Sequence, residues 1–334
     1  MSTQRSGILA AGNFIVDYVK IIEAYPEQDM LASILSESQA NGGGPYNVLK
    51  DLSAMQAGFP LAACGLVGDD ANGRWIHQDC EAYGIDATQL HLTHERSTSY
   101  TDAMTVQSTG RRTFFHQRGA NALFNEGHCD VSQTSARILH LGYLLLLDHM
   151  DSYAADGRTH AAHLLAAATQ AGLQTSVDMV STEHPQFREI ALSAMLHTDH
   201  LIINEIEASR VLNRTISSSD SSALLSAVQD LLALGVRQTV TIHTEHGVAV
   251  CTHENDEHFQ PSLLLPAGYS QGATGAGDAF AAGLLYALHE GWPLADRLRL
   301  AVCTAAASLS HPTPSGGMKP VHECLTLADD FGFR

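Results

Sequence analysis

Residues 271–288, QGATGAGDAFAAGLLYAL, join a glycine-rich turn to an apolar helical pattern and carry a single acid, Asp278. Gly272, Gly275 and Gly277 let the backbone turn tightly and approach a ligand closely. The helix that follows adds free N–H groups and the positive end of its dipole. The stretch therefore predicts a site for an anion such as phosphate.

Asp278 allows two interpretations in this setting. A carboxylate beside a bound anion is repelled by it, so an acid is useful there if it takes a proton from an attacking hydroxyl. Alternatively, it stabilises the N-terminus of the helix as an acid of the first turn. The turn is not a Walker A loop, because no Gly-Lys-Ser/Thr sequence follows the glycines.

Elsewhere, near-continuous apolar segments alternate with amphipathic ones. This alternation is typical of a parallel sheet that helices cover on both faces. We therefore predict a Rossmann-like three-layer α/β/α sandwich with a mostly parallel sheet. The expected strands are residues 7–16, 61–68, 137–147, 174–180, 200–204 and 237–243, and the expected helices include residues 44–58, 72–84, 159–172 and 221–235.

Two regions, about 14–38 and about 96–118, break this alternation with strand-like pieces of alternating polarity and a turn at Thr109-Gly110. They predict antiparallel strands that pair into a small sheet outside the main one and serve as a lid. The length of 334 residues fits one large α/β domain with such an appendage, so residues 1–334 are interpreted as a single domain.

The composition narrows the possible function classes. A hydrophobic content of 45% with 16% charged residues fits a globular protein, and the net charge of −18 argues against nucleic-acid binding, which needs clustered Lys and Arg. No signal peptide is evident, and the longest apolar run, near residues 141–148, is too short to span a membrane. Six scattered cysteines without a CxxC pair indicate reduced thiols, so we expect a cytoplasmic protein with no membrane partner.

The nineteen histidines raise the question of a metal site. His160 and His163 are separated by two residues, as are His243 and His246, but neither pair comes with a matching cysteine or carboxylate pattern. The HExxH arrangement of zinc hydrolases is absent. We interpret these histidines as exposed or hydrogen-bonded in the core, rather than as zinc ligands.

Three motifs together resemble one family. Residues 272–285, GATGAGDAFAAGLL, resemble the C-terminal signature of the ribokinase-like (pfkB) carbohydrate kinases, and residues 41–73 resemble their N-terminal glycine-rich signature. The family's N-x-x-E motif matches residues 204–207. The resemblance covers nearly the whole chain. It implies a kinase that uses ATP and Mg²⁺ to phosphorylate a hydroxyl, most readily a primary one, of a sugar or sugar-like molecule.

The resemblance also implies roles for individual residues. Asp278 matches the catalytic base, and the amides of Gly275, Ala276 and Gly277 match the anion hole. Asn204 and Glu207 match residues that position phosphate and Mg²⁺-bound water; alternatively, they are a helix N-cap and a first-turn acid. The acceptor residues implied are Asn13, Asp17, Gly43, Gly44, Asn47 and Arg111, and the nucleotide residues are Asn204, Thr244, Gly247, Thr274 and Gly277.

Some positions depart from the family pattern or leave alternatives open. Gly272 replaces the acid that opens the C-terminal signature and helps to form a monovalent-cation site, so we expect little dependence on K⁺. His243 or Thr244 replaces a glycine of the nucleotide loop, and Ile15 stands where ribokinase has a polar residue. Arg112, beside Arg111, is a second candidate for an acidic or phosphorylated substrate, or a solvated turn residue.

Two other functions stay open at this point. A nucleoside kinase of the same superfamily would need aromatic side chains to stack a base, for which Tyr18, Tyr46 and Phe114 are the lid-side candidates. A catalytically silent sugar-binding or regulatory protein is the other alternative, although a pure binder has no use for a base at Asp278. The family resemblance further implies a possible homodimer through the lid.

Overall fold

The apolar segments form the centre of a nine-stranded sheet, in which seven neighbouring strands are parallel. The computed structural model describes residues 5–334. The two antiparallel strands β12 and β13 extend the sheet at one edge. In spatial order the strands are β13 (Glu257–Pro261), β12 (Gly247–Thr252), β11 (Thr239–His243), β10 (His200–Asn204), β9 (Gln174–Met179), β8 (Ile138–Leu144), β1 (Ile8–Gly12), β4 (Leu61–Gly68) and β5 (Asp86–Thr93).

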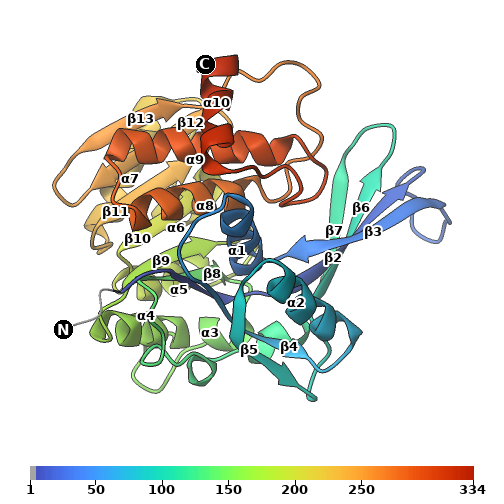
Figure 1. Cartoon of the computed structure of the whole chain (residues 1–334), viewed down its shortest axis with the longest axis horizontal. Coiled ribbons are helices and arrows are strands. Elements are labelled where there is room, and N and C mark those ends of the chain that lie inside the picture. Colours follow the sequence, from blue (N-terminus) through green and yellow to red (C-terminus); the bar gives the residue numbers. More distant parts are fainter. Residues whose placement is uncertain (1–4) are drawn as a thin grey trace.

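Helices cover both faces of this sheet (Figure 1). Successive residues of β1 enter different cores: Ile8 and Ala10 pack in one cluster, Leu9 and Ala11 in the other. This accounts for the unbroken apolar strands, because both faces are buried. One face carries α1 (Gly44–Ala54), α2 (Ala71–Ala82), α8 (Ala276–His289), α9 (Leu294–Leu309) and α10 (Val321–Phe331). The other carries α4 (His160–Gln170), α5 (Phe187–Met195), α6 (Glu205–Leu212) and α7 (Ser221–Ala233). The predicted three-layer fold is confirmed.

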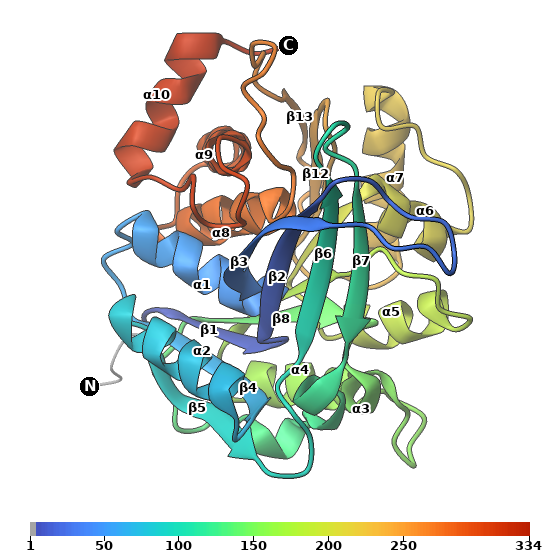
Figure 2. The same cartoon turned by 90° about the vertical axis from the view of Figure 1, so that its right-hand side faces the viewer.

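A second, four-stranded sheet projects from the side of the sandwich (Figures 1 and 2). We call it the small sheet; its order is β3 (Ile34–Gly42), β2 (Ile15–Ile22), β6 (Tyr100–Val106) and β7 (Arg112–Gln117). The hairpins β2–β3 and β6–β7 are antiparallel as predicted, and the second turns around Thr109 and Gly110.

The expectation of an entirely antiparallel small sheet is wrong at its centre, where β2 and β6 are parallel. Each follows closely on a strand of the main sheet, β1 or β5, and these belong to its parallel part. Both therefore leave the sandwich in the same direction. The expected strand 7–16 is correspondingly two strands, which separate at Asn13 and Phe14.

The chain order of the main sheet locates a binding crevice. From β1 the chain proceeds through β4 to β5 on one side, and then crosses to β8, β9, β10 and β11 on the other. Ligands of such sheets bind at the carboxyl ends of the strands, where the order reverses. Here that point lies between β1 and β8, next to Asn13 and Tyr143.

Two sequence expectations concern the molecule as a whole. All six cysteines are buried and free, which agrees with the expectation of reduced thiols. Among the helices of residues 5–334, none combines the length and the apolar character that crossing a bilayer requires. Three short helical segments complete the fold: η1 (Gly119–Leu123), η2 (Glu126–His128) and α3 (Asp148–Asp151).

Candidate active site

Asp278 lies in the first turn of α8, and its side chain is buried. Its Oδ2 accepts a hydrogen bond from Nδ2 of Asn47 at 2.7 Å, and its Oδ1 accepts one from the Tyr143 hydroxyl at 2.6 Å. Asn47 comes from α1 and Tyr143 from the end of β8. Three separate elements thus hold one carboxylate in a single orientation.

Further hydrogen bonds fix the two donors. Nδ2 of Asn41 donates to Oδ1 of Asn47 at 2.7 Å, so the amide nitrogen of Asn47 is the atom that faces Asp278. The same Asn41 nitrogen donates to Oγ of Ser315 at 3.0 Å. Oδ1 of Asn13 accepts from the backbone N–H of Tyr143 at 2.6 Å. A buried network therefore supports the carboxylate from several sides.

The environment raises the pKa of both acids in this region. Burial raises the pKa of Asp278 to about 6, although the hydrogen bonds from Asn47 and Tyr143 act in the opposite direction. Burial is also the main reason why the pKa of Asp17 is raised to about 7. The nearby charge of Asp278 raises this pKa further, whereas a hydrogen bond with the Thr101 side chain lowers it. A carboxylate whose pKa lies near neutrality is a suitable general base at physiological pH.

The turn before α8 presents free backbone donors. Gly275, the N-cap, has the left-handed φ of 81°, and a Cβ there would lie 2.6 Å from Cβ of Pro314. Among the described residues, the N–H groups of Gly275, Gly277 and Asp278 have no acceptor. The N–H of Ala276 makes a long bond of 3.3 Å to the oxygen of Ala273. The predicted anion-hole amides are thus clustered and largely unpaired.

The predicted acceptor residues other than Arg111 gather beside Asp278. A Cβ at Gly42 would overlap the carboxylate of Asp17, and a Cβ at Gly44 would lie 2.8 Å from the Tyr143 ring. Gly43 has a φ of 89°, and a Cβ there would overlap the backbone oxygen of Asn13. These glycines let the turn between β3 and α1 pack directly on the ends of β1 and β8.

Asn13 itself is fully buried. Its side chain bonds to the N–H of Tyr143 and, at 3.3 Å, to the oxygen of Leu146. The structure thus places it beside the site, where it orders the segment that carries Tyr143.

Asn204 and Glu207 form the capping box that was the structural alternative for this pair. Oδ1 of Asn204 accepts from the N–H of Glu207 at 2.9 Å, and Oε2 of Glu207 accepts from the N–H of Asn204 at 2.9 Å. Glu207 also accepts a bond from the Ser181 hydroxyl. Burial, together with the charges of Glu207 and Asp278, raises the pKa of Asp178 well above its usual range. Burial raises the pKa of Glu207 to about 7.

This donor set is compatible with Mg²⁺, which prefers oxygen ligands and keeps several waters. Asp178 and Glu207 are buried carboxylates that repel each other, so a nearby cation would stabilise their ionised forms. The capping role and a role toward hydrated Mg²⁺ do not exclude each other, since a carboxylate has more acceptor sites than the cap uses.

A cavity of about 560 Å³ lies on the other side of the α8 N-terminus. Asn204, Thr244, Gly247 and Gly277, four of the five predicted nucleotide residues, line it, and Phe280 contributes to an apolar wall. Its volume and mixed lining are those of a small-molecule site. The fifth residue, Thr274, lies outside this cavity, in the loop before α8.

The altered nucleotide loop has a structural explanation. Thr244 closes the turn between β11 and β12, where its hydroxyl accepts from the N–H groups of His246 and Gly247. His243 is half-buried and packs against the ring of Phe280 with a centroid distance of 5.0 Å, and desolvation lowers its pKa to about 4. A neutral imidazole therefore forms part of the wall where the family pattern has a glycine.

The two arginines of the small sheet differ in position. Arg111 is exposed at the turn, whereas the guanidinium of Arg112 donates to the Thr274 hydroxyl. A Cβ at Gly272 would lie 2.6 Å from Nη2 of Arg112. The structure thus places a cation next to position 272, and it brings Arg112 rather than Arg111 to the loop before α8.

The aromatic candidates for stacking a base are mostly engaged elsewhere. Tyr46 is fully buried with its hydroxyl on Asp79, and the Tyr18 hydroxyl donates to Asn72 at 2.7 Å. Phe114 is exposed.

The sequence reasoning missed Tyr143, Asn41 and Asp178. A polar hydroxyl at the carboxyl end of an otherwise apolar strand was the available signal for Tyr143.

Comparisons with known proteins agree with this geometry. A family model described as "pfkB family carbohydrate kinase" matches residues 9–320. The ATP-dependent ribose-1-phosphate kinase of Halopiger xanaduensis is 27% identical over 281 residues, which are 83% of each protein. A ribokinase of Arabidopsis thaliana is 26% identical over 302 residues, which are 87% of this chain and 72% of that protein.

A solved structure extends the likeness to the fold. Arabidopsis thaliana ribokinase, in complex with ribose and ATP, matches with a TM-score of 0.78 and 23% identity over 97% of this chain and 98% of that one. The predicted family and enzyme class are confirmed. The chain belongs to the pfkB family of carbohydrate kinases, and it is a phosphotransferase with a ribokinase-like fold.

Proposed function

We propose that this protein transfers the γ-phosphoryl group of ATP, with Mg²⁺, to a hydroxyl of a sugar or sugar-like molecule, preferentially a primary one. One observation carries the proposal: the buried carboxylate of Asp278 lies at the start of α8, directly beside unpaired N–H groups of the same turn. A proton acceptor and an anion site thus occur side by side, as phosphoryl transfer to a hydroxyl requires.

In the proposed reaction, Asp278 takes the proton of the acceptor hydroxyl while the oxygen forms a bond to the γ-phosphorus and ADP leaves. The N–H groups of Gly275 and Gly277 stabilise the charge on the transferred group, helped by the helix dipole of α8. Bound Mg²⁺ would neutralise charge on the nucleotide phosphates, held through water by Glu207 with Asp178 nearby.

The acceptor is proposed to bind between the main and small sheets. Asp17 and Asn47 would bond to sugar hydroxyls, and the turn at Gly43 and Gly44 allows a close approach of backbone groups. The small sheet would act as the lid that excludes water, a competing acceptor. Residues 1–334 then form one catalytic unit with this lid.

Two features of the proposal concern the setting of the enzyme. The small sheet exposes Ile34, Leu35, Phe114 and Phe115. A second copy of the chain would cover such a surface, so we include a homodimer through the small sheet. The free cysteines fit a reducing compartment, and we propose a cytoplasmic enzyme.

The acceptor class can be tested with a panel of sugars, polyols, sugar phosphates and nucleosides in an ADP-release assay. We expect turnover with at least one sugar or polyol and little with nucleosides, because Asp17 and Asn47 suit hydroxyls. Asp17→Ala should raise KM for the sugar by roughly 10- to 100-fold, the value of a lost charged hydrogen bond, and leave KM for ATP nearly unchanged. Asp102→Ala, in the same sheet, is the control. Turnover of nucleosides alone would contradict the proposal.

The role of Asp278 can be tested with Asp278→Asn. The amide keeps the size of the carboxylate but cannot accept the proton, so kcat should fall by roughly 10²- to 10⁴-fold. Thermal stability and ATP affinity should change little, which circular dichroism and calorimetry can check. If a folded variant keeps wild-type turnover, Asp278 is only a helix-start acid.

The pH dependence of kcat provides an independent check. Because Asp278 must be ionised to act as a base and its pKa is about 6, kcat should fall as the pH drops through about 6. An ordinary aspartate would titrate at about 3.9. Tyr143→Phe removes a hydrogen bond that favours the ionised form, so the fall should move to higher pH. Tyr153→Phe, at an exposed tyrosine, should leave the profile unchanged.

Monovalent-cation dependence tests the role of position 272. Because the guanidinium of Arg112 lies where K⁺ would need compensating negative charge, we expect similar rates in K⁺, Na⁺ and a bulky organic cation at fixed ionic strength. The obstacle to an acid at Gly272 is this side chain and Pro312, not the backbone conformation. Activation of about tenfold by K⁺ alone, about 1.4 kcal/mol, would show that other oxygens rebuild the site.

A further inference from the structure

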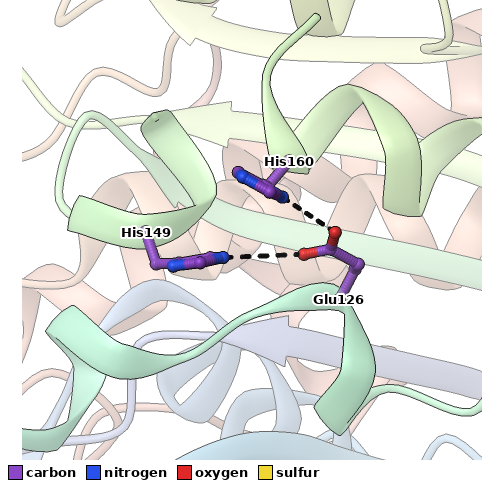
Figure 3. A group of neighbouring side chains, drawn as sticks. All are labelled: Glu126, His149 and His160. Carbon is purple, nitrogen blue, oxygen red and sulfur yellow. Dashed lines mark hydrogen bonds and ion pairs between the residues drawn. The ribbon is translucent and has the colours of Figure 1, made fainter. Parts of the chain in front are cut away.

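Three side chains that could bind a metal converge outside the proposed active site (Figure 3). They are Glu126 of η2, His149 of α3 and His160 at the start of α4. Nδ1 of His160 lies 2.8 Å from Oε1 of Glu126, and Nε2 of His149 lies 3.9 Å from Oε2. One ligand atom from each residue lies within 4.8 Å of the others.

Local structure positions these three elements. The carboxylate of Asp151 accepts from the N–H groups of Leu145 and Leu147 at 2.9 Å each, which fixes the loop that leads into α3. Thr159 caps α4 by accepting from the N–H of Ala162, and this places His160 in the first turn. The fold therefore fixes the backbone segments that carry His149 and His160, whose side chains are partly exposed.

The carboxylate of Glu126 lacks ordinary partners for part of its charge. Its Oε2 is buried and has no hydrogen-bond partner among the described residues. Within that part of the chain, its ion-pair partners are His149 and His160, and no Lys or Arg pairs with it. A buried carboxylate oxygen without a hydrogen-bond donor points to a missing cation.

We propose that Glu126, His149 and His160 bind one divalent transition-metal ion of the zinc type, with water as a further ligand. Two imidazole nitrogens and one carboxylate oxygen form a ligand set known for Zn²⁺, whereas Mg²⁺ prefers oxygen alone. Bond lengths of about 2.0–2.1 Å place the ligand atoms of a tetrahedral site about 3.3 Å apart. The spacings of 2.8 and 3.9 Å lie on either side of this value, so small side-chain rotations complete the site.

The sequence spacing draws attention to His160 with His163, a pair that we interpret as not binding zinc. His163 lies one turn along α4 from His160, but its Nε2 lies 3.0 Å from Oδ1 of Asp156. Its ring centroid is 6.3 Å from that of His160. The partner of His160 is instead His149, eleven positions earlier by their residue numbers. His163 is therefore a matched control: a histidine of the same helix that the site does not use.

The site would tie together segments that support the small sheet. η2 follows η1, in which the Asn121 side-chain amide donates to the backbone oxygen of Phe14 at 3.3 Å. The backbone N–H of Asn121 donates to Oγ of Ser99 at 3.2 Å. Phe14 and Ser99 precede β2 and β6 directly. A metal that joins η2 to α3 and α4 would therefore stabilise the base of the small sheet, away from the phosphoryl-transfer residues.

The test is calorimetric titration of the chelator-treated full chain with Zn²⁺ and Co²⁺, without nucleotide and with excess Mg²⁺. We expect one saturable site, a visible absorption spectrum for bound Co²⁺ and a rise in Tm of about 4 °C at 100-fold excess over Kd. His149→Ala, His160→Ala and Glu126→Gln should each lower the affinity at least about tenfold. His163→Ala should bind as wild type does.

Circular dichroism of each variant shows whether the variant is folded. Because three ligands are changed separately, the test remains decisive even if one of these variants does not fold. The proposal is overturned if the wild-type chain binds neither metal. It is also overturned if the folded ligand variants bind as tightly as His163→Ala. If His163→Ala lowers the metal affinity as much as the ligand variants do, the assigned ligand set is likewise excluded.

Discussion

The constraint on which the rest of the molecule depends is the burial of the Asp278 carboxylate. Removing a charge from water is costly unless hydrogen bonds replace the lost hydration. Asn47 and Tyr143 supply two of these bonds, but they come from α1 and from the end of β8. The three elements must therefore meet within hydrogen-bond distance. This requirement links the N-terminal glycine-rich turn, the central sheet and the C-terminal helix, which lie far apart in the sequence.

The glycines follow from that close approach. Gly12 has a φ of 127°, and a Cβ there would overlap the backbone oxygen of Gly142 across the β1–β8 pair. Gly43 and Gly44 play the same part at the turn before α1, against Asn13 and Tyr143. Each glycine thus lacks a Cβ where its backbone closely approaches another segment: a backbone at Gly12 and Gly43, and the Tyr143 ring at Gly44. A tight crevice at the reversal of the strand order results, and the Asp278 carboxylate is at its base.

The sequence predicted the elements well and their partners less well. Apolar runs identified strands such as β4 and β10, and the glycine-rich turn identified the start of α8, because both are local patterns. Sheet order is not local, so neither the parallel pairing of β2 with β6 nor the contact of Tyr143 with Asp278 could be derived. The same holds for Glu126 and His149, which approach each other only through the packing of η2 against α3 and α4.

Charge balance explains why Arg112 matters to this site. Asp178, Glu207 and Asp278 are buried together, and the added phosphates of a nucleotide would raise the negative charge further. Asp51, also buried near Asp278, has a pKa that burial raises well above its usual range. Cations must therefore come from outside the sheet. In the proposed reaction Mg²⁺ would supply one such charge. Arg112, carried by β7 of the small sheet, supplies another, since it contacts Thr274 in the loop before α8. The small sheet thus places a positive charge beside the loop before α8, where the proposed reaction would add phosphate charge.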